Sequence, residues 1–365
     1  MVEPFFPSGC EPVQSRRRFL MLSAGLIGLN GSRDASAQSH DGTDVIREHA
    51  TTPLDPWAVS HGLRAMGRDF TIQGGRRAVD FLLEEQVAAV TVNGRTILGV
   101  PRTVEIHPNM FLKTILEAGV PLSHGFSHKG QRRTLADVVD GAKLLLRPGH
   151  EPPSEMAWSI TALTRTTSPL RARWTNAWGE PVDLDALVGS ALEALERDSA
   201  SLSEAMRQGR SLSARAPAHE LTCGGTHLIY GLIAAAHAGY AGNGRGQRLR
   251  QQVDLLVWRL AADVDLIDRF YAAQKPTPFA SLMHLDAKLK LLGHAEECLA
   301  LATRRKVVVL SETQQGRRQT AIAETRRLLG EVGRLDLAKL RPRHFEAYQQ
   351  LVGDVCHARH GLTLS

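Results

Sequence analysis

The sequence has few aromatic residues and few cysteines for its length. Only 5% of its 365 residues are Phe, Trp or Tyr, and four are cysteines. So low an aromatic content disfavours a protein that grips long polysaccharides along a row of stacked rings. So few cysteines exclude a small disulfide-bonded scaffold. Three of them follow residue 37, so one thiol stays outside any intrachain bridge, and the sequence leaves open whether Cys298 and Cys356 pair.

Long apolar runs, basic clusters and alternating strand patterns are also scarce. Beyond residue 37 no segment approaches the roughly 20 apolar residues that cross a bilayer, so we expect no stable transmembrane segment. The net charge is +6, and the first 37 residues, with four basic and three acidic side chains, carry +1 of it. The remaining +5 is spread along the chain, which excludes a nucleic-acid-binding protein and is compatible with an anionic substrate.

The first 37 residues have the order of features expected of an export leader. Residues 15–20, Ser-Arg-Arg-Arg-Phe-Leu, resemble the twin-arginine export motif, and a short apolar run (19–29) and the small residues Ala-Ser-Ala (35–37) follow. The resemblance implies a leader over 1–37 and a mature chain that starts near Gln38. It also implies export in the folded state by the twin-arginine machinery to a periplasmic or secreted location.

The rest of the chain, 38–365, predicts a single domain that is almost entirely helical, because apolar residues recur at i, i+3, i+4 and i+7. One set of helices opens at a capping residue or proline and closes at a glycine; these are 56–67, 108–119, 155 onward, 224–239 and 278–293. A second, more charged set alternates with it, over 76–89, 135–146, 184–197, 249–273 and 320–332. Residues 87–100, with Asn93-Gly94 at their centre, are the best hairpin candidate.

The starts of the first set are about 50 residues apart, with one gap nearer 70, which indicates repeated helical hairpins. Such hairpins stack into an open solenoid or close into a ring. Residues 228–239 are apolar on nearly all sides, which favours burial inside a ring. The layout resembles, in architecture only, the α/α toroids of terpenoid cyclases, protein prenyltransferases and several polysaccharide-degrading enzymes. The resemblance implies an all-α fold, an α/α toroid of helical hairpins with short irregular or hairpin insertions.

The segment 220–227 contains the clearest candidate site. Cys223 and His227 are four residues apart, so on a helix they share one face. Gly224 and Gly225 between them suit a backbone that another group approaches closely. A thiolate and an imidazole bind zinc, copper or iron, or act as nucleophile and base. The alternative is a small buried thiol and a hydrogen-bonded histidine that only pack the fold.

Several of the fifteen histidines lie near the starts of the first helix set. In a toroid these starts meet at one mouth, where distant histidines can share a metal or transfer protons. We therefore consider Cys223, His227 and His107 as catalytic candidates, and Cys223, His227, His61 and His284 as ligands of a transition metal. Taken singly, each histidine is equally explained by local capping or packing.

The loop 174–180 brings two indoles close together. Indole rings stack on sugars and also fill gaps between helices. The candidate substrate-binding residues are Trp57, Trp174, Asn176 and Trp178.

Two functions fit these features. The first is an exported enzyme with a His/Cys site, acting by hydrolysis or elimination on an envelope or extracellular substrate such as a glycan or another anionic molecule. The second is a non-catalytic periplasmic protein that binds a glycan or a protein. Metal content separates the two.

Overall fold

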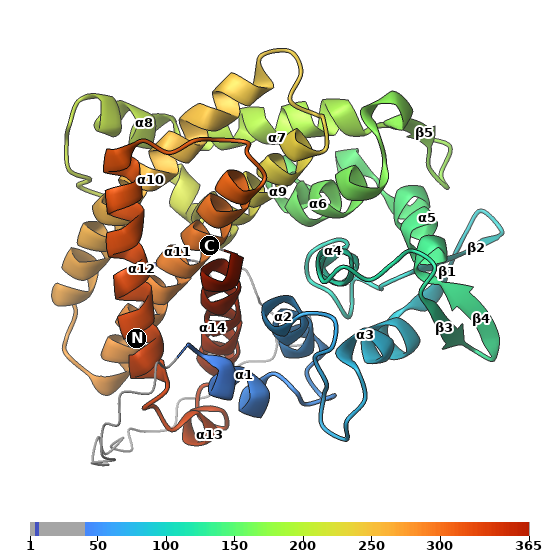
Figure 1. Ribbon diagram of the computed structural model, residues 1–365, viewed down its shortest axis with the longest axis horizontal. Coiled ribbons are helices and arrows are strands. Elements are labelled where there is room, and N and C mark those ends of the chain that lie inside the picture. The colour runs from blue at the N-terminus through green and yellow to red at the C-terminus, as the bar shows by residue number, and fades with distance from the viewer. Residues whose placement is uncertain (1–3, 7–40, 365) are drawn as a thin grey trace.

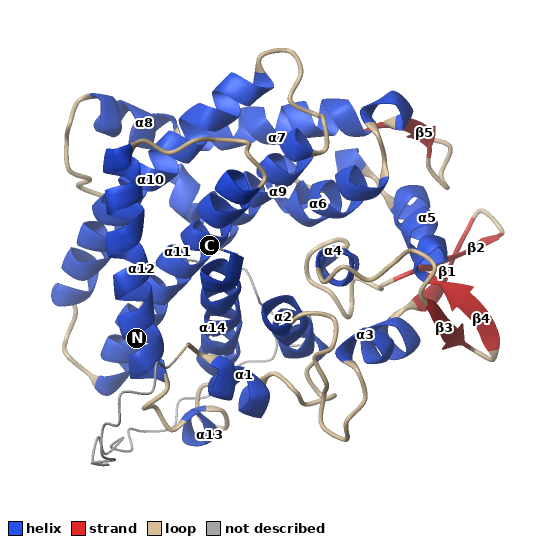
Figure 2. Cartoon of the chain, viewed as in Figure 1, coloured by secondary structure: helices blue, strands red, loops and turns tan. Residues whose placement is uncertain are grey.

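The computed structural model describes residues 4–6 and 41–364, and helices dominate them (Figure 2). The leader motif and the expected cleavage site lie outside the described residues. The helices are α1 (Thr43–His49), α2 (Pro56–Met66), α3 (Ala78–Phe81), α4 (Met110–Glu117), α5 (Leu135–Leu145), α6 (Ala157–Thr166), α7 (Leu184–Asp198), α8 (Ala200–Arg207), α9 (Thr226–His237), α10 (Arg245–Ala272), α11 (Pro278–Arg304), α12 (Glu312–Val332), α13 (Leu337–Leu340) and α14 (Phe345–Leu364).

Three separate two-stranded antiparallel hairpins are the sheet structure in this part of the chain. They are β1 (Ala88–Val92) with β2 (Arg95–Gly99), β3 (Gly125–His128) with β4 (Gln131–Thr134), and β5 (Arg173–Thr175) with β6 (Pro181–Asp183). The first is the predicted hairpin. Its turn residues Asn93 and Gly94 have φ of 47° and 75°, as a tight two-residue hairpin turn requires.

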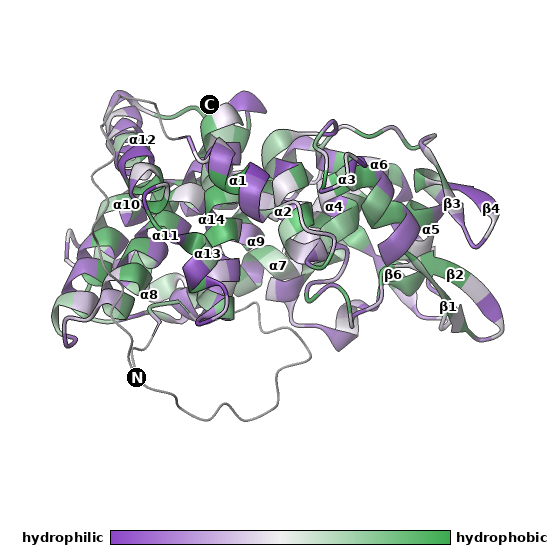
Figure 3. Cartoon of the chain, turned by 90° about the horizontal axis from the view of Figure 1, so that it is seen from below, coloured by the Kyte–Doolittle hydropathy of each residue, from purple (hydrophilic) through white to green (hydrophobic). Residues whose placement is uncertain are grey.

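Six helices contact one another in order around the centre of the molecule. α2 packs against α4, α4 against α6, α6 against α9, α9 against α11, α11 against α14, and α14 returns to α2 (Figure 1). The more charged helices lie outside these: α7 and α10 both contact α9, and α12 contacts α11. Polar residues accordingly mark α12 at the edge of the molecule (Figure 3).

Local signals in the sequence position the first of these helices. The Asp55 carboxylate accepts from the Ala58 amide at 3.0 Å, Pro56 occupies the first turn, and Gly67 ends α2 with φ of 83°. Thr277 and Pro278 open α11 in the same way.

The expected end of α11 at Gly293 is wrong, because that helix continues to Arg304. Gly293 instead permits close packing of α11 against α14, since a Cβ atom there would lie 3.0 Å from Ala358. Gly361 has the same role from the other side, where a Cβ atom would lie 2.8 Å from the Glu297 amide nitrogen. The helix α14 itself was not among those predicted.

Three apolar clusters stabilise the described part of the chain, the smallest of them formed by Val92, Ile97 and Ala177 beside the hairpins. The largest one joins the six central helices to the helices outside them. The second lies between α8, α10 and α11 and includes Phe5 and Phe6 from the N-terminal segment. Within the described ranges, no helix has both the length and the apolar character needed to cross a membrane.

Candidate functional site

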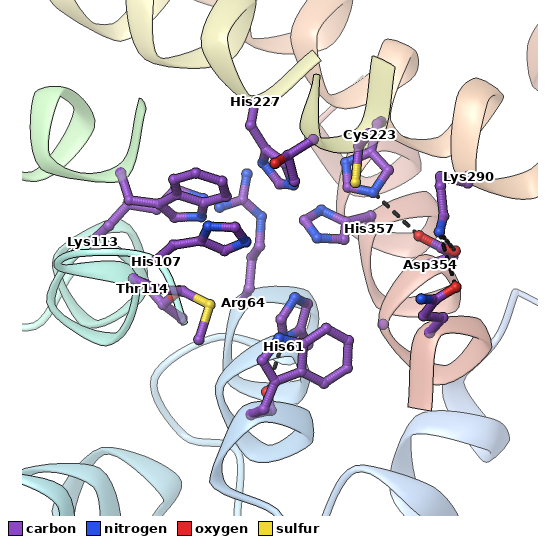
Figure 4. Close-up of a pocket in the computed structure, with 17 residues that line it drawn as sticks. His61, Arg64, His107, Lys113, Thr114, Cys223, His227, Lys290, Asp354 and His357 are labelled. Atoms are coloured by element: carbon purple, nitrogen blue, oxygen red, sulfur yellow. Dashed lines mark hydrogen bonds and ion pairs between the residues drawn. The ribbon is translucent and has the colours of Figure 1, made fainter. Parts of the chain in front are cut away.

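A small pocket, with a cavity volume of about 40 Å³, opens where α2, α4, α6, α9, α11 and α14 approach one another (Figure 4). It is lined mainly by aromatic and basic side chains, together with one thiol and one carboxylate: Trp57, His61, Arg64, His107, Met110, Lys113, Thr114, Trp158, Thr222, Cys223, His227, Lys290, His294, Gln350, Gly353, Asp354 and His357. Five histidines and one cysteine in one cavity are the ligand types that transition metals prefer.

Cys223 enters the pocket from a constrained turn that leads into α9. Three successive residues, Cys223, Gly224 and Gly225, have φ of 49°, 64° and 82°. Glycine adopts this left-handed region without steric penalty, whereas for a residue with a Cβ atom it costs about 1–3 kcal/mol. The turn is secured from two sides. Arg259 Nη1 donates to the Gly224 carbonyl at 2.8 Å, and Thr226 Oγ1 donates to the Cys223 carbonyl at 2.8 Å.

The ligating atoms of Cys223, His227 and His294 all lie within 4.8 Å of one another. His227 lies in the first turn of α9 and His294 in the middle of α11, whereas Cys223 lies in the turn before α9. The prediction that Cys223 and His227 share one face of a helix is therefore wrong, although the turn still brings them together. The ring centres of His227 and His294 are 4.7 Å apart. In Figure 4 the labelled side chains of Cys223, His227 and His357 are directed into the same space. One ion of the size of zinc could contact all three residues of the first group after small side-chain shifts.

A second group, His294, Glu297 and His357, also lies within 4.8 Å and shares His294 with the first. Here the carboxylate is already engaged. Arg64 contacts both Glu297 oxygens, at 2.7 and 3.2 Å, and Nδ1 of His357 and of His360 donates to one oxygen each, at 2.7 and 2.6 Å. Glu297 therefore orients imidazoles and is the poorer candidate ligand, which favours the first group.

The other histidines of the pocket each have one ring nitrogen occupied by an acceptor. His61 Nδ1 donates to the Trp57 carbonyl at 2.8 Å, and His107 Nδ1 donates to Glu155 Oε2 at 2.7 Å. His294 Nε2 lies 3.2 Å from Asp354 Oδ1. A donated Nδ1 hydrogen leaves the lone pair of a neutral ring on Nε2, as in histidines whose orientation is set by an outer carboxylate.

Burial sets the protonation state of these rings. It lowers the pKa of His61 to about 4 and that of His294 to about 3. Burial, and then the neighbouring His294, lower the pKa of His227, and burial also lowers that of His357. All four rings are therefore neutral at pH 7, which is the state that binds metal.

Two buried cations, Arg64 and Lys290, flank the histidines and are held by acids. Arg64 bridges Glu297 to Glu117, its Nη1 lying 2.6 Å from Glu117 Oε2. Lys290 Nζ lies 3.5 Å from Asp354 Oδ2. Burial, and then Asp354, raise the pKa of Asp286 on the same helix as Lys290. The cations are thus balanced by acids, and the neutral imidazoles are the main ligating groups of the pocket.

The structure brings together five of the residues selected from the sequence. Cys223, His227, His61, His107 and Trp57 all line the pocket. None of the three cysteines in the described residues forms a disulfide bond, and the Cys298 thiol donates to the Thr226 carbonyl at 3.2 Å.

Four selected residues lie elsewhere. His284 is near the start of α11, where Nε2 lies 2.6 Å from Asp268 Oδ1 and the ring stacks on Tyr271. His284 lies near the start of α11, whereas His294, which lines the pocket, lies near the middle of the same helix. Trp174, Asn176 and Trp178 belong to the β5–β6 hairpin, outside the lining residues of the pocket.

Sequence reasoning did not select His294, Glu297 or His357. A signal was present, because His294 and Glu297 are three residues apart on α11, and His357 and His360 are three apart on α14. Pairs at this spacing share a helix face. Glu155, which orients His107, was not selected either.

Comparison with protein-family models, with curated proteins and with solved structures gives no match to this chain.

Proposed function

We propose that this chain is an exported enzyme that binds one transition-metal ion through Cys223, His227 and His294 and uses it in a hydrolytic or elimination reaction. The observation that carries the proposal is the convergence of a thiol and two imidazoles within 4.8 Å in an open pocket. The second support is the neutral state that burial imposes on the surrounding rings.

The fold that we propose is an α/α toroid over a single domain. The closed order of contacts α2–α4–α6–α9–α11–α14–α2 supports it, as does the position of the charged helices outside. In this arrangement the pocket lies at one mouth of the ring, where side chains from six helices meet.

The donor set suits zinc, copper or iron, and such an ion would polarise the substrate and acidify water. His107 is the candidate general base. Its Nε2 would take a proton from the attacking water while Nδ1 stays hydrogen-bonded to Glu155, and it would then return that proton to the leaving group. Burial raises the pKa of Glu155, but the hydrogen bond and charge of His107 outweigh this effect, so the carboxylate stays ionised to stabilise the imidazolium. For elimination, the same nitrogen would take a proton from carbon, the C–H electron pair would form the double bond, and the leaving group would depart with its bonding electrons.

The walls of the pocket define a substrate class. Trp57 and Trp158 offer flat apolar faces, and Lys290 offers an ammonium group. A small molecule with a carbonyl or phosphoryl group and an anionic or hydroxylated substituent fits these surfaces. An envelope or extracellular substrate agrees with the export that we propose from the leader.

The proposal is tested by elemental analysis of protein purified after native export. We expect about one zinc, copper or iron ion per chain, and a loss of roughly tenfold or more in metal affinity for Cys223→Ser and for His294→Ala. His284→Ala is the matched control, because that histidine lies outside the pocket and should leave metal content unchanged.

Helical circular dichroism separates loss of metal from loss of fold. A parent protein that neither contains nor takes up any of the three metals would contradict the enzyme proposal and favour a non-catalytic binding protein. Export is tested separately: Arg16→Lys with Arg17→Lys should leave precursor in the cytoplasm, and normal export of that variant would refute the leader assignment.

A further inference from the structure

The described tip of the N-terminus lies directly behind the Cys223 turn. Phe5 and Phe6 are 1% and 4% exposed, which is the burial of core residues. Their rings meet edge to face, and Phe5 packs in the same way against Phe270 of α10. The Phe5 amide donates to the Tyr271 hydroxyl at 3.2 Å. A short segment at the chain terminus is thus fixed by both apolar and polar contacts.

Phe6 makes a close contact with the glycine that follows Cys223. A Cβ atom at Gly224 would lie 3.0 Å from a ring carbon of Phe6 and 3.0 Å from Arg259 Nη2. The left-handed turn is therefore enclosed between an aromatic ring and a guanidinium group. The Phe6 ring is thus the group that approaches the backbone closely at position 224, where only glycine leaves enough room.

A buried chain of polar groups fixes the opposite side of the same turn. His219 Nδ1 accepts from the Ala216 amide at 2.8 Å, so Nε2 carries the hydrogen that faces Asp263 Oδ1 at 3.2 Å. The other Asp263 oxygen accepts from Arg259 Nε at 2.8 Å, and Arg259 then donates to the Gly224 carbonyl. The His219 ring also packs edge to face on Phe5, which joins the terminal segment to this chain.

We infer that Pro4–Phe6 is an intramolecular wedge that docks between α10, α11 and the 217–225 segment and holds the Cys223 turn in its left-handed conformation. The docking surface is apolar, and its occupant is the N-terminal tip of this chain. The wedge affects the pocket through the backbone of Gly224, without touching the ligands themselves. Its residues therefore position Cys223 and are not catalytic.

One consequence rests on the proposed export. The wedge precedes the arginine pair, so cleavage before Gln38 would remove it together with the leader. The precursor would then hold the Cys223 turn fixed, and the processed chain would release it and expose the aromatic surface behind it.

The test uses the full chain and needs no metal, so its outcome is independent of the metal proposal. The variant is Phe5→Ala with Phe6→Ala, and Leu170→Ala, a fully exposed apolar residue, is the matched control. Hydrogen exchange is read at the amides of Gly224 and Thr226, which donate to the Leu221 and Cys223 carbonyls. We expect exchange there to be at least about tenfold faster in the double variant and unchanged in the control.

Two further arms keep the test decisive. A synthetic peptide of residues 2–9 added to the double variant should restore slow exchange, and the same peptide with both phenylalanines replaced by alanine should not. If the double variant fails to fold, Phe6→Leu replaces it, with an intermediate increase expected. Exchange equal to that of the parent in the folded variant, or an equal change in Leu170→Ala, would overturn the proposal.

Discussion

The pocket and the β5–β6 hairpin both contain residues that the sequence marked as functional, and they differ in how their polar groups are satisfied. In the hairpin these contacts are made within the loop itself or to backbone carbonyls at the end of α5, and they use up the polar groups. The Asn176 amide donates to the Leu146 carbonyl and to Glu180, and its oxygen accepts from two nearby amides. The Trp174 indole nitrogen donates to the Lys143 carbonyl at 2.9 Å. These groups hold a loop together and have little capacity left for a ligand.

In the pocket the contacts are long-range, and they leave ligating atoms directed at a common space. Arg64, Glu297 and His357 come from three different helices, yet they form one hydrogen-bonded group. Each orienting bond uses one nitrogen of a ring and leaves the other available. A site differs from a structural loop because side chains that still have a ligating atom available converge on one space. The number of polar or aromatic residues does not make this distinction.

The largest effect should follow from breaking the buried centre of the pocket. Glu297→Gln removes the charge that faces Arg64, His357 and His360, all of which contact this carboxylate. Loss of one partner from a buried ion pair costs about 3–5 kcal/mol, because the other charge stays buried. Urea denaturation measures the loss. Glu180→Gln, which removes the ion-pair partner of Arg147 in the hairpin, is the control and should cost much less. If the two variants lose the same free energy of unfolding, the pocket and the hairpin do not differ in the way described above.

The second prediction uses pH to sharpen the same comparison. Because burial lowers the pKa of His61 to about 4, the unfolded chain binds a proton at this position between pH 6.5 and 4 that the folded chain does not. Stability therefore falls as the pH falls through this window, by up to about 1.4 kcal/mol per pH unit for one histidine. Burial raises the pKa of Glu105 to about 7, an effect of opposite sign, so the informative quantity is the difference between a variant and the parent.

His61→Gln should reduce the slope of stability against pH by that amount, as measured by urea midpoints between pH 7 and pH 5. His150→Gln is the control on the hairpin side, where the His150 side chain is 56% exposed. A parental slope in His61→Gln would mean that this ring is protonated in the folded state.

The sequence predicted the helical class because the spacing of apolar residues is a local property. Asp55-Pro56 and Asn93-Gly94 likewise contain all the information needed for a helix start and a turn. The course of α14 could not be read in this way. Its glycines, Gly353 and Gly361, read as helix breakers, and they are accounted for only by the indole of Trp57 and the backbone of α11 that lie against them.

The site shows the same limit. Cys223 and His227 were found because their spacing and the glycines between them are local signals. Their partner His294 is 67 positions away from His227 along the chain, on a helix that was predicted to end one residue earlier. His284 was chosen in its place because it lies near a helix start. The part of a long helix that faces the pocket depends on how far the helix extends. Gly293 was predicted to end α11, but it serves close packing against α14, so the sequence did not show the true length of this helix.

The smallest effect should come from the hairpin indole that resembled a sugar-binding residue. Trp178 packs beneath the Arg147 guanidinium, 4.6 Å from ring centre to carbon, and this contact is at the surface. Trp178→Ala should shift the melting temperature by no more than about 2–4 °C and leave metal content unchanged, because this ring packs only on a small apolar cluster beside the hairpin and does not line the pocket. Trp57→Ala should do more, since that indole lines the pocket, stacks on His61 at 3.8 Å and lies against Gly353 of α14. Melting curves and metal analysis of the two variants measure the difference. A larger effect of Trp178→Ala on either quantity would show that the hairpin contributes to the site, and that polar groups already used in hydrogen bonds do not identify a structural loop.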